Sequence, residues 1–344
     1  MQSLLDPAIL FFVFGILAGA LKSNLEIPPQ ISRFLALYLL MALGLKGGFA
    51  LAKSGLTQEV TLSLGCAIAL AVVVPAIGYW LLRRFLNGFD AAAIAATYGS
   101  VSAVTFITAV QYLDSRGLPY GGHMAAAMAL MESPAIIMAV LLANLVRQRQ
   151  TSASDSDSDS GKASGNSSTA PIPGVFRGVS VGRILHESFT DGAQLLLLGA
   201  MAVGILTGEA GQVAMQPFAG DLFKGMLSFF LLDMGLLAAR NMGELRGKSP
   251  WLLAYAVVAP ITHAGLALAL GIAVGMSPGN GALLMVLAAS ASYIAVPAVL
   301  RHAIPEANPS LYFGMSLGLT FPFNILVGIP LYVYMAHRWL PLPA

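Results

Sequence analysis

The sequence predicts an all-α membrane protein with ten transmembrane helices, arranged as two inverted five-helix repeats whose fourth and ninth helices are broken and cross. Three observations predict this fold. Of the 344 residues, 57% are hydrophobic and only 10% are charged, whereas soluble domains carry about 25% charged residues. The apolar residues gather in stretches long enough to cross a bilayer. Similar short motifs recur at matching positions in the two halves.

Ten apolar spans divide evenly around a polar segment near the middle of the chain. The first five cover residues 7–21, 34–52, 61–82, 91–112 and 122–146. The other five lie near residues 188–207, 222–240, 251–275, 280–300 and 310–336. A helix needs about 20 apolar residues to cross the hydrocarbon, and most of these spans have that length.

The polar segment contains an alternating run of serine and aspartate that includes Asp155, Asp157 and Asp159. Such a composition cannot bury a core and favours disorder. We therefore expect residues 1–149 to form the first five-helix repeat and residues 186–344 to form the second. Residues 150–185 are expected to be a disordered linker between them.

The basic residues predict the orientation in the membrane. Of the 18 lysines and arginines, five fall on the same side as the N-terminus, namely Lys46, Lys53, Arg116, Lys224 and Arg338. The others fall on the opposite side. Because cytoplasmic loops carry an excess of lysine and arginine, both termini are predicted outside and the 150–185 linker in the cytoplasm.

The internal repeat is clearest in the fourth and ninth spans. An offset of 190 residues places Ser100 and Ser102 on Ser290 and Ser292. Since each half contains an odd number of spans, two homologous halves would be inverted relative to each other. Inverted repeats with interrupted helices at matching positions are typical of secondary transporters.

Small and hydroxyl side chains in these two spans indicate broken helices. They are Gly99, Ser100, Ser102 and Thr105 in the fourth span, and Ser290 and Ser292 in the ninth. Serine favours helix caps, and a proline inside a helix removes a backbone donor. The N–H groups exposed at a break attract small anions, and the carbonyl ends can hold a cation. The alternative is ordinary helix packing, which also uses small residues.

Few ionisable residues interrupt the apolar spans. Asp233 and Glu132 are functional candidates because a carboxylate within a membrane span is costly, although Asp233 can also lie near a helix end in water. Tyr293 can donate to a substrate oxygen or pack as an aromatic side chain. Asn324 is expected to hydrogen-bond across helices. No P-loop, HExxH, GxSxG or cysteine cluster occurs, so the sequence predicts no enzyme.

Several motifs together point to one family. They are the Gly44-Leu45-x-Gly47-Gly48 run, residues 242–246, Val101-Ser102 with Thr105, the Ala288-Ala289-Ser290-x-Ser292 run and residues 304–310. In this combination the chain resembles the sodium-dependent bicarbonate symporter family, and the resemblance covers nearly the whole chain outside the serine- and aspartate-rich segment.

The resemblance implies a homotrimer in the bacterial plasma (inner) membrane that imports bicarbonate or another small anion with sodium as the coupling ion. No cofactor and no nucleic acid are implied. Membrane lipid and a PII-like regulatory protein on the cytoplasmic face are the other implied partners. The implied substrate-binding residues are Gly99, Ser100, Ser102, Thr105, Ser290, Ser292 and Tyr293. The implied cation ligands are Ser102, Ser290, Ser292 and Asp233.

The chain departs from the family pattern in the ninth span. Well-known members carry an aspartate, a serine and Gly-Pro-Pro where this chain has Tyr293, Ala295 and Val296-Pro297-Ala298. Asp233 or backbone carbonyls would have to replace the missing cation ligands. An organic-anion or other small-anion carrier, or a cation/proton antiporter, on the same scaffold is therefore the alternative. A membrane receptor or intramembrane enzyme is disfavoured because catalytic motifs are missing.

Overall fold

A computed structural model describes residues 6–157, 192–245 and 247–341. These residues form helices and no strand. By length and composition, seven helical segments among them can cross a membrane, and Pro7–Ala20 and Pro278–Ala289 are shorter apolar helices. The protein is therefore an all-helical, multi-pass membrane protein.

The first half of the chain forms six helices, namely α1 (Pro7–Ala20), α2 (Pro29–Ser54), α3 (Gln58–Leu82), α4 (Gly88–Gly99), α5 (Ala103–Asp114) and α6 (Met124–Asp157). Polar side chains begin several of them. The Asp6 carboxylate accepts from the Ala8 backbone N–H at 2.9 Å at the start of α1, and Asn87 caps α4 in the same way through Asp90 N. Such caps satisfy backbone donors that have no acceptor within the helix.

The second half begins with α8 (Gly192–Met215), where Gly208 has a positive φ of 54° and interrupts the regular helix. It continues with η2 (Gln216–Asp221), α9 (Phe223–Met242), η3 (Gly243–Leu245), α10 (Pro250–Val274), α11 (Pro278–Ala289), α12 (Ala295–Ala303), α13 (Pro309–Phe313), η4 (Gly314–Thr320), α14 (Phe321–Phe323), η5 (Asn324–Gly328) and α15 (Ile329–Trp339). The stretch from α13 to α15 is a continuous helical path with wide turns at η4 and η5.

Each predicted apolar span contains helix, while the count of ten membrane crossings stays a prediction. The predicted breaks in spans four and nine coincide with the ends of α4 and α11. In the predicted 150–185 linker, residues up to Asp157 continue α6. Residues 158–185 lie outside the described part of the chain.

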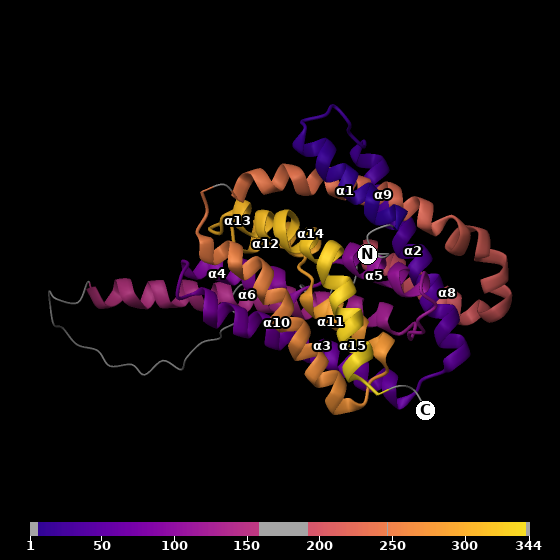
Figure 1. Cartoon of the computed structure of the whole chain (residues 1–344). Coiled ribbons are helices and arrows are strands. Elements are labelled where there is room, and N and C mark those ends of the chain that lie inside the picture. Colours follow the sequence, from indigo (N-terminus) through magenta and orange to yellow (C-terminus); the bar gives the residue numbers. More distant parts are fainter. Residues whose placement is uncertain (1–5, 158–191, 246, 342–344) are drawn as a thin grey trace.

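Four helices form one layer of the fold. α1 packs along α9, and α2 packs along α8 (Figure 1). Close approach requires glycine at these contacts, because a Cβ on Gly15 would lie 2.3 Å from the Leu232 carbonyl oxygen. A Cβ on Gly48 would lie 2.2 Å from the Met201 carbonyl oxygen. Small residues allow membrane helices to pack in this way.

The remaining helices form a second body beside this layer. α3 packs against α4 and α6, and α10 packs against α11 and η4. An ion pair of 2.9 Å between Arg147 and Glu306 joins α6 to the loop after α12, and its hydrogen bond lowers the pKa of the Glu306 carboxyl. Large apolar side chains such as Phe14, Ile77 and Val258 are exposed on the outside, as lipid contact requires.

Candidate functional site

The site begins with two interruptions in the second body. α4 ends at Gly99, the chain is extended at Ser100 and Ser102, and α5 starts at Ala103. The Ser102 hydroxyl produces the new start, because it accepts hydrogen bonds from Thr105 N at 3.2 Å and from the Thr105 hydroxyl at 2.9 Å. The cap therefore fixes the direction in which α5 leaves the break.

The second interruption has a similar construction. α11 ends at Ala289, Ser290 is extended, and α12 starts at Ala295. The Ser292 hydroxyl accepts from Val296 N at 3.2 Å. Asn324 donates to the Ala289 carbonyl oxygen at 2.8 Å. This bond confirms that Asn324 hydrogen-bonds across helices and satisfies the end of α11.

The two interruptions contact each other through a pair of hydrogen bonds. Ser102 N donates to the Ser290 hydroxyl at 2.9 Å, and Ser292 N donates to the Thr97 carbonyl oxygen at 2.9 Å. Each break thus supplies an acceptor for the amide of the other. The amides of Ser102 and Ser292 are therefore already hydrogen-bonded within the protein and do not donate to a ligand in this structure.

A cavity of about 1310 Å³ opens at the junction of these breaks, between the α1–α2–α8–α9 layer and the second body. Its lining includes Ser102, Ser292, Tyr293 and Asp233. Ala103 and Val104 also line it. Their N–H groups stand in the first turn of α5, where no carbonyl of the same helix can accept from them. Two backbone donors without an acceptor in their own helix therefore belong to residues that line the cavity where α5 begins.

The other predicted site residues are buried behind this lining. Ser290 donates to the Leu287 carbonyl oxygen at 2.9 Å while accepting from Ser102 N. Thr105 supports Ser102. The Ser100 hydroxyl is buried and has no hydrogen-bond partner. Gly99 packs against the ring of Pro75, where a Cβ would lie 2.6 Å from ring carbons.

Asp233 on α9 faces the second break across the cavity. Only 6% of Asp233 is exposed, and its Oδ2 has no hydrogen-bond partner. Ser32 of α2 lies next to this carboxylate. Tyr293 directs its hydroxyl to the Met234 sulfur at 3.7 Å, and its ring packs edge-to-face with Phe321 at 5.3 Å between centroids. A buried carboxylate with a free oxygen is suited to bind a cation.

The charged side chains around the cavity balance in sign. Arg33, Arg240 and Arg301 line it together with the three carboxylates of Glu26, Glu132 and Asp233. The net charge of the cavity lining therefore does not favour an anion, and selection for one would depend on individual hydrogen-bond donors. Among the described residues, no group of three His, Cys, Asp or Glu side chains is placed to hold a metal ion.

Sequence reasoning did not find every residue at this junction. The Thr97 carbonyl that accepts from Ser292 N carries no sequence signal, since any residue offers a carbonyl. Ser32 lies beside Asp233 only through the packing of α2 against α9. A hydroxyl in an otherwise apolar span could have drawn attention to Thr97, whereas Ser32 lies just before the second predicted span.

A family model, the Na⁺-dependent bicarbonate transporter superfamily, matches residues 7–337. The chain belongs to the Na⁺-dependent bicarbonate transporter superfamily. Membership in this superfamily confirms the resemblance seen in the motifs and makes the protein a transporter rather than an enzyme. The superfamily is one of Na⁺-dependent anion transport in general, with sodium as the coupling ion that its name implies. A comparison with individual curated proteins finds no match.

Proposed function

We propose that this member of the superfamily is a secondary active transporter that imports bicarbonate by sodium-coupled symport. The observation that carries the proposal is the reciprocal hydrogen bonding of the two interruptions at the end of the large cavity. In the proposed architecture, ten helices form two inverted repeats. α4–α5 and α11–α12 are then the crossing, broken helices. Paired breaks of this kind bind substrates in secondary transporters.

The proposed anion site lies at the start of α5. The Ala103 and Val104 amides, with the Ser102 and Ser292 hydroxyls, offer donors to the oxygens of a carboxylate-like anion. Tyr293 adds a phenolic donor when its hydroxyl leaves the Met234 sulfur. Four other predicted residues act through these groups: Thr105 and Ser290 position the break, and Gly99 and Ser100 allow it to pack closely.

The proposed cation site is centred on Asp233. Tyr293 occupies the position of the family aspartate, and the free Oδ2 of Asp233 supplies a carboxylate from the opposite wall. The Ser102 and Ser292 hydroxyls complete an oxygen environment of the kind that sodium prefers. Ser290 contributes by holding Ser102 N. Coupling follows if the cation and the anion neutralise each other at the same junction.

A second candidate is an organic-anion or other small-anion carrier. The cavity volume of about 1310 Å³ favours it, because bicarbonate has only four heavy atoms and fills a small part of this space. A cation/proton antiporter receives less support, since neither break, residues 100–102 or 290–294, contains an acidic residue.

The assembly and setting of the transporter follow the resemblance. We propose a homotrimer in a bacterial plasma membrane, with both termini outside and the linker of residues 150–185 in the cytoplasm. A PII-like regulatory protein on the cytoplasmic face is proposed on the same ground. The distribution of basic residues supports the orientation.

The test is uptake of radiolabelled bicarbonate into proteoliposomes, with and without an inward sodium gradient. Sodium-stimulated uptake is the expected result and shows that coupling survives the tyrosine at position 293. No uptake from folded protein under either condition would contradict bicarbonate transport. Competition by unlabelled organic anions, with no competition by bicarbonate, would favour the second candidate.

A further inference from the structure

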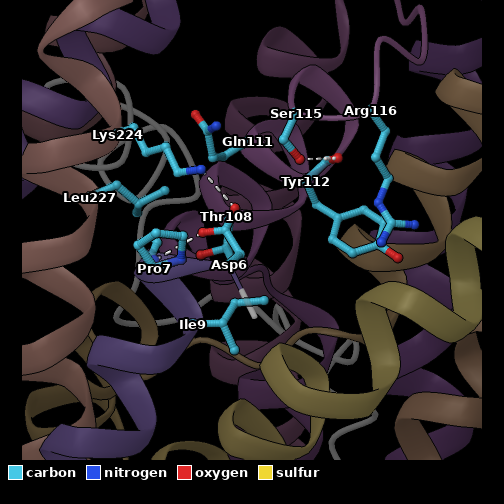
Figure 2. A pocket seen from close by; sticks show the side chains of 11 residues that line it. Asp6, Pro7, Ile9, Thr108, Gln111, Tyr112, Ser115, Arg116, Lys224 and Leu227 are labelled. Carbon is cyan, nitrogen blue, oxygen red and sulfur yellow. Dashed lines mark hydrogen bonds and ion pairs between the residues drawn. The ribbon is translucent and has the colours of Figure 1, made fainter. Parts of the chain in front are cut away.

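A second, smaller cavity of about 520 Å³ lies at the other end of the helices that line the large one. Figure 2 shows its side chains. The large cavity is lined by the first part of α5, from Ser102 to Ile107, and by α9 residues from Phe230 onward. The smaller cavity is lined by the last part of α5 and by Lys224 and Leu227 near the start of α9. The two cavities therefore open toward opposite ends of the same two helices.

The linings of the two cavities come within one helical turn of each other on α5 and on α9. On α5, Ile107 lines the large cavity and the next residue, Thr108, lines the small one. On α9, Phe230 lines the large cavity, and Leu227, one helical turn earlier, lines the small one. One turn rises about 5.4 Å. Ile107, Leu227 and Phe230 are all buried, so apolar side chains lie between the two linings on these helices.

The smaller cavity carries an excess of positive charge. Its lining holds Lys224 and Arg116 but only one carboxylate, that of Asp6. Lys224 Nζ lies 2.9 Å from Asp6 Oδ2, and the two side chains point toward each other in Figure 2. The other oxygen of Asp6 accepts from Ala8 N. Arg116 stacks on the Tyr112 ring at 4.0 Å, so its guanidinium has no carboxylate in this lining.

Polar groups continue from these cations toward the apolar side chains between the two linings. Thr108 and Gln111 on α5 and Ser115 directly after it lie three or four residues apart, and all three line the cavity. Residues at this spacing occupy one face of a helix. At the other end of α5, the N-cap residue Ser102 lines the large cavity. A hydrated anion would therefore meet hydrogen-bonding side chains along α5 on both sides of these apolar side chains.

We propose that the smaller cavity is an anion-binding vestibule on the membrane face opposite to the large cavity, where Lys224 and Arg116 hold a small inorganic anion before it crosses the partition of Ile107, Leu227 and Phe230. The proposal rests on the proposed transport function and adds a binding site at the other end of the transport pathway. Both cations belong to the basic residues predicted to lie outside, so the vestibule faces the side from which import begins.

Cysteine labelling tests the position and charge of the vestibule without any need for transport. Cys66 is the only native cysteine, so single cysteines are introduced in a Cys66→Ser background. Membrane-impermeant thiosulfonate reagents, one anionic and one cationic, are added to right-side-out and inverted vesicles. Gln111→Cys should be modified from one face only, and Asn241→Cys in the large cavity from the other face only. Ala109→Cys is the matched control and should resist both, because Ala109 is fully buried.

The charge of the vestibule predicts the reagent preference. The anionic reagent should modify Gln111→Cys faster than the cationic one, and adding Lys224→Gln should lower this ratio about tenfold, as loss of a charge within a few ångströms of the site requires. Labelling of Gln111→Cys and Asn241→Cys from the same face, or a ratio unchanged by Lys224→Gln, would overturn the proposal.

Transport kinetics test the vestibule independently of the labelling. Lys224→Gln should raise the KM for bicarbonate about fivefold with little change in kcat, because the charge concentrates the anion before the barrier. Lys53→Gln is the control, since Lys53 is exposed on the same predicted face and lies outside the cavity lining. An equal KM for both variants would contradict the vestibule. Absent bicarbonate uptake in the unmodified protein would contradict the proposed function alone, since the labelling result would stand.

Discussion

The two interruptions differ in how firmly the chain holds them. The first has three residues between α4 and α5, and Ser102 caps a helix of 12 residues. The second has five residues between α11 and α12 and leads into a helix of 9 residues. Its N-cap residue Ile294 makes no side-chain cap, and Ser292 supplies one acceptor, for Val296 N, where Ser102 accepts two hydrogen bonds. Ile294 is 60% exposed. We infer that the first break is a preorganised anion site and that the second adjusts when a cation binds.

The largest effect is expected from Ser102→Ala. The change removes the cap of α5 and leaves the buried Thr105 amide and hydroxyl without their acceptor. A lost cap costs about 1 kcal/mol, and each unsatisfied buried group costs about 1–3 kcal/mol. Bicarbonate uptake should fall at least about tenfold. Initial rates in proteoliposomes measure this effect.

Ser100→Ala is the matched control for that variant. The Ser100 hydroxyl is equally buried but has no hydrogen-bond partner, so its removal should leave uptake close to the unmodified level. An equal loss of uptake in both variants would show that any substitution in this segment impairs transport. Uptake at the unmodified level in Ser102→Ala would show that Ser102 is not part of the anion site.

A stability effect distinguishes the backbone of the first break. Gly99→Ala places a Cβ 2.6 Å from the Pro75 ring, and overpacking of this kind costs about 1–3 kcal/mol. The melting temperature in detergent should fall. Gly65→Ala on α3 is the control, because a Cβ there meets no atom within 4 Å. Equal melting temperatures would mean that the contact with Pro75 relaxes freely.

A smaller effect is expected at the second break. Ser292→Ala removes one acceptor, that of Val296 N at 3.2 Å, and the hydroxyl that lines the cavity. One cap of about 1 kcal/mol corresponds to about a fivefold change in uptake. If Ser292→Ala impairs uptake more than Ser102→Ala, the assignment of the anion to the first break is wrong.

The smallest change is expected in sodium dependence. Tyr293→Asp places a second carboxylate across the cavity from Asp233 and should lower the half-saturating sodium concentration about threefold, because a carboxylate at this range attracts a cation only weakly in a hydrated cavity. Tyr293→Phe is the control, since it removes the hydroxyl without adding charge. An unchanged sodium response in Tyr293→Asp would mean that this position does not contact the cation.

The sequence predicted the helices and the positions of both breaks, but it did not predict how the breaks meet. Apolar length and Ser-x-Ser spacing are local properties, so α4 and α11 end where the serines start. The bond from Ser292 N to Thr97 O is a tertiary contact between carbonyl and amide groups that every residue possesses. The predicted substrate-binding residues therefore differ in position, with Ser102, Ser292 and Tyr293 on the cavity lining and Ser290 outside it.

The sequence also did not predict which side chains pack against each other between helices. From its position in the sequence alone, Asp233 could be a buried carboxylate or one in contact with water. In the structure α9 packs against α1 and α2, and Asp233 is 6% exposed and lines the cavity. Gly99 is a predicted binding residue because of its neighbours in sequence, and its close approach to the Pro75 ring is a contact that the sequence does not show. Side-chain neighbours across helices decide such cases.

Equilibrium binding of radiolabelled bicarbonate to the purified protein tests the central claim most directly, because it separates the site from the rest of the transport cycle. The binding is measured in sodium and in choline for the unmodified protein, Ser102→Ala and Ser100→Ala. We predict sodium-dependent binding that is retained in Ser100→Ala and weakened about tenfold in Ser102→Ala. Equal binding by all three proteins, or binding indifferent to sodium, would contradict a coupled anion site at the meeting point of the two breaks.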